Sequence, residues 1–173
     1  KQRLAELGFV LDMDTAASRD MATSRDLKNY DFAFPSSAPV AEKIIRDGEG
    51  ATRIFRVNVR GAASDEAAMK IARAIVDSPL VKCAVHGKDP NWGRIVTAAG
   101  NAEVPFSPEQ TSLSIGGVQV YTGGRPTGLD RKDARVAAAM SAPEVFMELS
   151  VGYGPGHGWM IGCDLSRDYV GIN

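Results

Sequence analysis

Glu49 is the residue whose neighbours most suggest chemistry, because it lies between two glycines in the block Arg46–Thr52. Glycines on both sides let other groups approach the backbone closely, and either glycine can adopt a positive φ. A carboxylate held in this way can receive a cationic or N–H-bearing ligand. The same pattern also ends helices, although a glutamate near a helix C-terminus is unfavourable for the helix dipole. A ligand contact and a helix end are therefore both open for Glu49.

Two histidines could act as acid–base groups. His86 follows an apolar run and precedes Gly87, a kind of position at which loops carry function, and His157 lies in a glycine-rich segment. A histidine beside a turn is more often structural, and no Ser/His/Asp order can be defended from the sequence. The residues alone therefore identify no catalytic group.

The glycine-rich segment 152–158 could cradle a phosphate. It lacks the lysine of a P-loop, and no helix start follows it. We therefore expect a flexible hairpin connection between two strands.

The block Asp89–Arg94 allows two interpretations. Asn91, Trp92 and Arg94 could line a pocket in which Arg94 binds a carboxylate through two hydrogen bonds. Alternatively, Asp89 caps a helix, Trp92 anchors the core and Arg94 pairs with an acidic neighbour. The second, structural interpretation is favoured.

Composition narrows the class of protein. The chain has 173 residues and a net charge of −1, which suits one domain and offers no electrostatic basis for binding nucleic acid or an anionic membrane. No apolar stretch approaches the roughly 20 residues that cross a bilayer. Because no secretory signal is visible, we expect Cys83 and Cys163 to be buried free thiols in the cytoplasm. No CxxC or HExxH spacing predicts a metal site.

The elements that must position these residues follow from hydrophobic periodicity. Residues 1–35 form a divergent or partly ordered segment, and residues 36–173 form the single domain. Since the chain begins at Lys1, we expect a processed product, a fragment or a trimmed form. Strands are expected at 52–60, 80–85, 113–115, 118–121, 145–151 and 159–163, and helices at 39–48, 64–77, 89–99, 131–140 and 164–170. This mixed order with hairpins predicts an α+β layered sandwich instead of a doubly wound parallel sheet.

Five blocks in order resemble one known family, the ornithine acetyltransferases of the ArgJ type, in the C-terminal β chain. These enzymes are bifunctional glutamate N-acetyltransferases of the cyclic arginine pathway. The similarity spans about three quarters of the chain. The blocks are Arg46–Thr52, Ser78–Lys82, Gly87–Ile95, Gly162–Leu165 and Tyr169–Asn173.

The resemblance implies an acyltransferase of arginine and amino-acid biosynthesis that moves an acetyl group from N-acetylornithine to glutamate. It implies an autoproteolytic precursor that cuts itself before a threonine, which then becomes the nucleophile of a ping-pong acyl-enzyme mechanism, with the oxyanion held by the α chain. It implies no cofactor, with acetyl-CoA as a further acetyl donor in many members. The implied fold is an αββα-type sandwich completed by the α chain, assembled as a dimer of αβ units, a heterotetramer.

The resemblance also assigns two substrate contacts. Glu49 matches the glutamate that contacts the amino-acid substrate, and Asn173 matches the asparagine that does the same. A carboxylate can receive an α-ammonium, and an amide can bond a carboxylate. The nucleophilic threonine with its Gly-Ala-Thr-Met signature is missing here, and Thr23 is set aside because it lies too close to Glu49 in the sequence. The alternatives are a catalytically silent amino-acid-binding or structural relative, and an amide hydrolase on the same scaffold.

Overall fold

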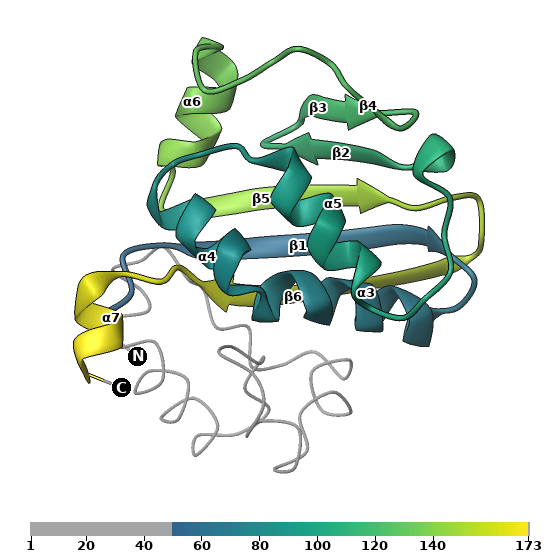
Figure 1. Cartoon of the computed structure of the whole chain (residues 1–173), viewed down its shortest axis with the longest axis horizontal. Coiled ribbons are helices and arrows are strands. Elements are labelled where there is room, and N and C mark those ends of the chain that lie inside the picture. The colour runs from purple at the N-terminus through teal and green to yellow at the C-terminus, as the bar shows by residue number, and fades with distance from the viewer. Residues whose placement is uncertain (1–49, 173) are drawn as a thin grey trace, which may run out of the picture.

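A six-stranded sheet with helices packed on it organises the protein in a computed structural model that describes residues 50–172 (Figure 1). The strand order is β4-β3-β2-β5-β1-β6. The strands are β1 (Ile54–Ala62), β2 (Ser112–Ile115), β3 (Val118–Thr122), β4 (Arg125–Pro126), β5 (Glu144–Ser150) and β6 (Gly156–Cys163). The helices are α3 (Asp65–Asp77), α4 (Pro79–His86), α5 (Trp92–Gly100), α6 (Ala134–Ser141) and α7 (Arg167–Ile172). The predicted α+β layered class is confirmed.

Several predictions fall outside the described residues. These are the segment 1–35, the helix at 39–48, Thr23, and both substrate contacts, Glu49 and Asn173. Gly50 is described and follows Glu49 directly, whereas α7 ends one residue before Asn173.

β1 is an interior strand of the sheet, next to the edge strand β6, and its alternation is the predicted one. It pairs parallel to β5 and antiparallel to β6. Phe55, Val57 and Val59 are buried in the core, which lies between the sheet and the helices α3, α4 and α5 on one of its faces (Figure 1). The predicted helix at 64–77 is also confirmed. Ser64 caps α3 by accepting a hydrogen bond from the Ala67 N–H, as a serine at this position favours.

Residues 80–85 form a helix, so the predicted strand is wrong. Pro79 occupies the first turn of α4, where its fixed φ fits and its missing N–H costs nothing. Val81, Ala84 and Val85 are buried together, which a spacing of three and four residues allows in a helix but not in a strand. Packing of this face against α3 and α5 outweighs the strand preference of the valines.

The change from strand to helix also corrects the cysteine prediction. Cys83 lies on the outer side of α4 and is exposed, whereas Cys163 at the end of β6 is fully buried. Both are free thiols.

The glycine-rich segment connects β5 to β6 around the end of β1, so it is not the predicted hairpin. β1 lies between these two strands in the sheet. The Gly154 N–H donates to the Gly61 carbonyl at 3.0 Å as the connection passes. A Cβ at Gly61, where φ is +80°, would lie 2.2 Å from the Gly152 carbonyl oxygen. Glycine is therefore required here by close backbone approach.

The remaining elements differ from the predictions mainly at their ends. The β2–β3 hairpin on Gly116-Gly117 is confirmed. Helix α6 begins at Ala134 behind an Asp133 cap. Asn91 caps α5 in place of the predicted Asp89, because its side chain reaches the Arg94 N–H at 3.2 Å. None of the helices between residues 50 and 172 is long and apolar enough to cross a membrane.

Replacing Gly61 with alanine should destabilise the protein more than replacing Gly117, although both have a left-handed φ. A methyl group added at Gly117 would meet nothing within 4 Å, so Gly117→Ala carries only the conformational cost, about 1–2 kcal/mol. Gly61→Ala adds a backbone clash, and we expect a further loss of at least about 2 kcal/mol. Urea unfolding of the complete protein measures both, and equal losses would contradict the close approach.

Candidate functional site

A buried carboxylate joins the ends of β6, β1 and α4 at one end of the sheet. Asp164 follows β6 and is fully buried. Its Oδ1 accepts hydrogen bonds from the backbone N–H groups of Thr52 (2.8 Å) and Arg53 (3.1 Å), just before β1. Its Oδ2 accepts one from the Thr52 hydroxyl (2.5 Å) and lies 2.8 Å from Nδ1 of His86. Four donors make the burial of this charge tolerable.

His86 is the last residue of α4, and its ring points back toward Asp164. The Asp164 carboxylate accepts hydrogen bonds from two N–H groups and a hydroxyl, and an ionised carboxylate has no proton to donate. Nδ1 of His86 therefore carries the proton of this contact. The His86 side chain is 42% exposed. The backbone carbonyl of His86 accepts a hydrogen bond from the Arg53 guanidinium at 3.2 Å, which is a second contact with the start of β1. Asp164 and Arg53 together therefore set the position of His86.

The chain entering β1 is also attached to α7. The Ser166 hydroxyl donates to the Gly50 carbonyl at 2.5 Å and accepts from the Tyr169 N–H at 2.9 Å. At Gly50, with φ +87°, a Cβ would lie 2.5 Å from the Tyr169 backbone nitrogen. Gly50 thus lies directly against α7, at the left-hand end of the sheet in Figure 1.

Lys82 and Cys163 lie beside this cluster. Lys82 of α4 is buried, and this burial lowers the pKa of its ammonium group, an effect that the nearby Cys163 opposes. Burial raises the pKa of the Cys163 thiol to about 11; Lys82 acts in the opposite direction, and Asp164 adds to the increase. The Cys163 thiol is therefore neutral and unreactive near pH 7.

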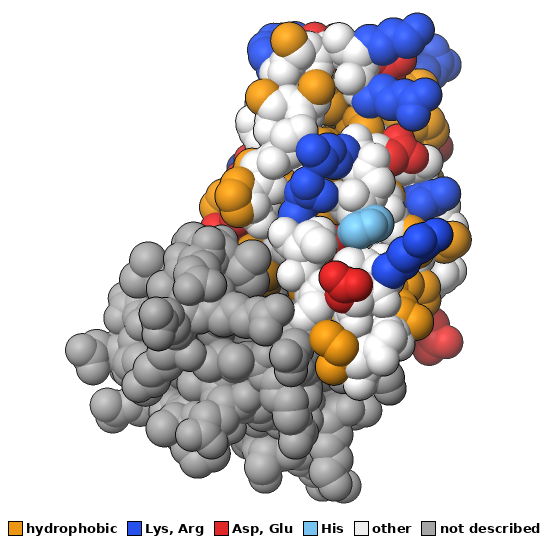
Figure 2. All heavy atoms as spheres, turned by 90° about the vertical axis from the view of Figure 1, so that its left-hand side faces the viewer, with side chains coloured by type: hydrophobic (Ala, Val, Ile, Leu, Met, Phe, Trp, Pro, Cys, Tyr) orange, Lys and Arg blue, Asp and Glu red, His pale blue; other side chains and the backbone are white. Residues whose placement is uncertain are grey.

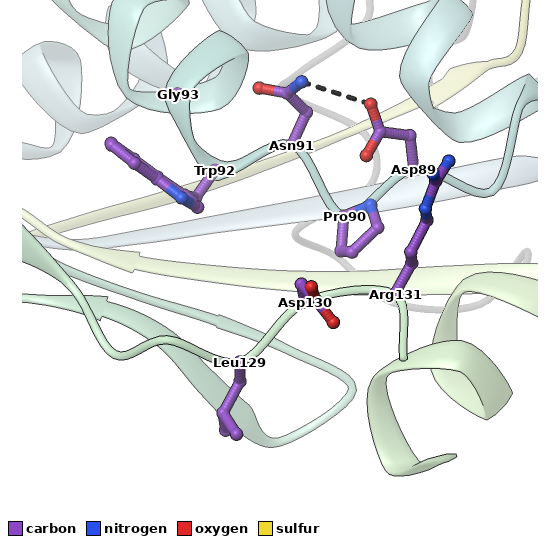
Figure 3. A pocket seen from close by; sticks show the side chains of 8 residues that line it. All are labelled: Asp89, Pro90, Asn91, Trp92, Gly93, Leu129, Asp130 and Arg131. Carbon is purple, nitrogen blue, oxygen red and sulfur yellow. Dashed lines mark hydrogen bonds between the residues drawn. The ribbon is translucent and has the colours of Figure 1, made fainter. Parts of the chain in front are cut away.

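A pocket of ≈ 270 Å³ lies between the α4–α5 connection and the segment before α6 (Figure 3). Two of its lining residues are bonded to each other, since the Asn91 amide donates a hydrogen bond to the Asp89 carboxylate at 3.1 Å. The Arg131 side chain extends alongside Asp89, and Leu129 points away from Asn91 and Trp92. The lining residues are Asp89, Pro90, Asn91, Trp92, Gly93, Leu129, Asp130 and Arg131.

The predicted members of this pocket are only partly right. Asn91 and Trp92 line it, and the Trp92 ring stacks on Tyr121 with centroids 5.1 Å apart. Arg94 does not line it and, within residues 50–172, pairs with no acidic side chain, since its guanidinium donates to the Leu80 carbonyl at 3.1 Å. The basic side chain that lines the pocket belongs to Arg131. Arg131 lies in a polar segment that the sequence predicted only as the start of a helix.

His157, the second predicted acid–base group, lies at the opposite end of the sheet from His86 and Asp164. His157 is the second residue of β6 and lies opposite Arg60, and its Nδ1 lies 3.2 Å from the exposed Asp65. The predicted start of the last helix at Asp164 is wrong, because the helix begins at Arg167. Over residues 50–172 there is no group of three His, Cys, Asp or Glu side chains that could hold a metal ion. Figure 2 looks at the end of the molecule that carries α4, α6 and α7, where lysine and arginine side chains gather in the upper half.

Comparison with known proteins gives the family. The sequence profile of the ArgJ family matches residues 14–173. This chain belongs to the ArgJ family. It is 49% identical over 134 residues to the arginine biosynthesis bifunctional protein ArgJ of Parasynechococcus marenigrum, covering 78% of this chain and 32% of that protein. It is 43% identical over 153 residues to the ArgJ protein of Bradyrhizobium diazoefficiens, covering 88% and 37%.

The fold agrees with this assignment. The crystal structure of the ArgJ protein from Bacillus halodurans superposes with a TM-score of 0.70 at 40% identity, over 78% of this chain and 63% of that one. The chain thus spans about a third of the length of the full ArgJ proteins that it matches.

Removing the Asp164 carboxylate should destabilise the protein strongly. Asp164→Ala removes the acceptor of four hydrogen bonds, two of them from backbone N–H groups, and we expect a loss of about 3 kcal/mol or more in the free energy of unfolding. Thr52→Val removes only the hydroxyl contact and should cost about 1–2 kcal/mol, whereas Thr52→Ser keeps it and should cost less than about 0.5 kcal/mol. Urea unfolding compares the three, and equal costs for Val and Ser would show that the hydroxyl contact contributes nothing.

The two cysteines should differ sharply in alkylation. With a pKa of about 11, roughly one Cys163 thiol in a thousand is ionised at pH 8, and its burial also blocks access. Cys83 is exposed and should react with iodoacetamide in the native protein, while Cys163 should react only after unfolding. Peptide mass spectrometry distinguishes the two sites. Labelling of Cys163 at the rate of Cys83 would contradict its burial.

Proposed function

We propose that the chain is the β-chain part of an ornithine acetyltransferase that moves an acetyl group from N-acetylornithine to glutamate. The observation that carries the proposal is family membership, with relatives named as bifunctional proteins of arginine biosynthesis. In the proposed ping-pong mechanism, a threonine outside residues 1–173 takes the acetyl group as an ester, and the glutamate amine then accepts it. The enzyme works in the cytoplasm.

The junction between Gly50 and α7 supports a shared substrate site for Glu49 and Asn173. Glu49 is bonded directly to Gly50, and Gly50 lies against the backbone of Asp168 and Tyr169. Asn173 follows the last residue of α7. Residues 124 positions apart in the sequence are therefore attached to segments that meet. In the proposal, the Glu49 carboxylate receives the substrate α-ammonium, and the Asn173 amide bonds its carboxylate.

The face of the sheet opposite the helices supports an α-chain partner. Side chains alternate along β5, so Phe146 points away from the core that Val145 and Met147 join. Phe146 is 45% exposed, and the Arg56 guanidinium lies 5.6 Å from its ring centre. A large aromatic ring exposed on a sheet face fits a layer supplied by another chain. The proposed assembly is a dimer of αβ units.

The proposal requires no cofactor, because the chemistry is acyl transfer between a hydroxyl and two amines. Acetyl-CoA is a second donor in the proposal. No carboxylate or thiolate cluster among the described residues suggests a metal requirement.

The test is intact mass spectrometry of the complete purified protein together with an acetyl-transfer assay. We expect an α chain and a β chain that begins with threonine, and transfer of acetyl from N-acetylornithine to glutamate. Release of acetate without transfer would favour the amide hydrolase, and amino-acid binding without turnover would favour the silent relative. Absence of the threonine would overturn the transferase proposal.

Glu49→Gln should weaken glutamate and ornithine binding by about tenfold or more without unfolding the protein. The substitution keeps the shape of the side chain and removes the charge that receives the ammonium group. Glu103→Gln is the matched control, since Glu103 is exposed in a turn after α5. Isothermal calorimetry measures the affinities. An unchanged affinity for Glu49→Gln would leave only a helix-end role.

A further inference from the structure

We propose that the pocket between the α4–α5 connection and the segment before α6 binds a free α-amino acid with a small aliphatic side chain. The inference goes beyond the proposed acetyl transfer, which assigns no role to the residues of this pocket. The observation that carries it is the set of charges around the cavity. The carboxylates of Asp89 and Asp130 and the guanidinium of Arg131 all line it.

The guanidinium of Arg131 is not neutralised by a neighbouring side chain. Its side chain extends alongside Asp89 in the same pocket (Figure 3). Among residues 50–172, no ion pair or hydrogen bond joins Arg131 to Asp89, to Asp130 or to another acidic side chain. An arginine that held the two segments together would pair with one of these carboxylates. The guanidinium can therefore bind the acidic group of a ligand.

The two carboxylates each keep one oxygen for a ligand. Oδ2 of Asp89 accepts a hydrogen bond from the Asn91 amide at 3.1 Å, and Oδ1 of Asp130 accepts one from the Lys132 N–H at 2.7 Å. Within residues 50–172, the second oxygen of each carboxylate accepts none. An ammonium group has three donors, so it can bond both of these oxygens.

Opposite charges around one cavity select a ligand that carries both charges. A ligand with only a carboxylate would lie beside two negative side chains, and a ligand with only an ammonium group would lie beside Arg131. A free α-amino acid satisfies both requirements. Its carboxylate can bond the guanidinium through two hydrogen bonds, and its ammonium group can bond Asp89 and Asp130.

The first turn of α5 offers the ligand carboxylate a further donor. The Asn91 side chain caps the Arg94 N–H. Gly93 also lines the pocket, and in the described part of the chain its N–H has no acceptor. Such an N–H can add to the contact that Arg131 makes with a carboxylate.

The size and the walls of the pocket limit the rest of the ligand. Pockets for drug-sized molecules have about 300–1,000 Å³, so a cavity of ≈ 270 Å³ fits a smaller molecule. Its apolar surface comes from the buried Pro90 and from Trp92, whose ring is held by its stack on Tyr121. A small aliphatic side chain suits these two rigid rings.

Isothermal calorimetry of the complete purified protein with L-valine tests the inference. Two analogues separate the charges: 3-methylbutanoate lacks the ammonium group, and 2-methylpropylamine lacks the carboxylate. We expect saturable binding of valine and at least about tenfold weaker binding of either analogue, because each leaves part of the charge set unpaired. No binding of valine, or equal affinity for all three compounds, would overturn the inference.

Three variants locate the site. Arg131→Gln and Asp130→Asn should each weaken valine binding by about tenfold or more. The asparagine keeps an oxygen that can accept from the Lys132 N–H, and all three altered positions are exposed, so urea unfolding should match that of the unaltered protein. Lys132→Gln is the matched control, since Lys132 is the adjacent cation and does not line the pocket. Equal losses for Arg131→Gln and Lys132→Gln would mean a general charge effect and would contradict the site.

The Glu49→Gln variant distinguishes this site from the proposed substrate site. It should keep the affinity of the unaltered protein for valine. Valine binding that is lost in Glu49→Gln and kept in Arg131→Gln would belong to the substrate site and would overturn the inference. Valine binding that depends on Arg131, in a protein without acetyl transfer, would overturn the proposed function and support the pocket.

Discussion

The buried charge of Asp164 is the constraint on which this end of the protein depends. A carboxylate removed from water must be matched by donors, and these come from the entry to β1 and from the end of α4. The requirement brings together residues that are more than 70 positions apart in the chain, as for His86 and Asp164 (|i−j| = 78). It also holds the His86 ring in place at the end of α4. The packing of three chain segments thus depends on one carboxylate.

The parallel pairing of β1 with β5 has a comparable effect on the opposite end of the sheet. It places β1 between β5 and β6, so the chain must pass around the end of β1 to return. Gly61 and Gly152 allow the two backbones to approach within a distance that a side chain would block. The glycine-rich connection therefore follows from the sheet topology. The two ends of the sheet therefore differ. Close backbone approach at Gly61 and Gly152 shapes one end, and the hydrogen bonds of Asp164 shape the other.

Hydrophobic periodicity predicted most of the described elements, because β1 and α3 each bury one regular face. It failed for residues 80–85, where a short apolar run fits either period and packing against α3 and α5 decided for a helix. The resemblance to the ArgJ family predicted the family correctly. The Asp164 cluster was missed, since Gly162-Cys163-Asp164 offers only a helix-cap signal and its partners are distant in sequence. The roles of Glu49 and Asn173, the domain boundaries, the absence of a cofactor and the cytoplasmic location stay predictions.

The sequence by itself determined the α+β class, the family and the residue types available at the site. Those properties are local or come from ordered blocks, so they can be read along the chain. Only the tertiary structure decided that Asp164 bonds Thr52 and His86, that Gly50 lies on α7, and that Arg131 instead of Arg94 lines the pocket. The physical reason is that hydrogen bonds between distant segments depend on strand order and helix packing. Neither of these leaves a periodic signal in the residues that they bring together.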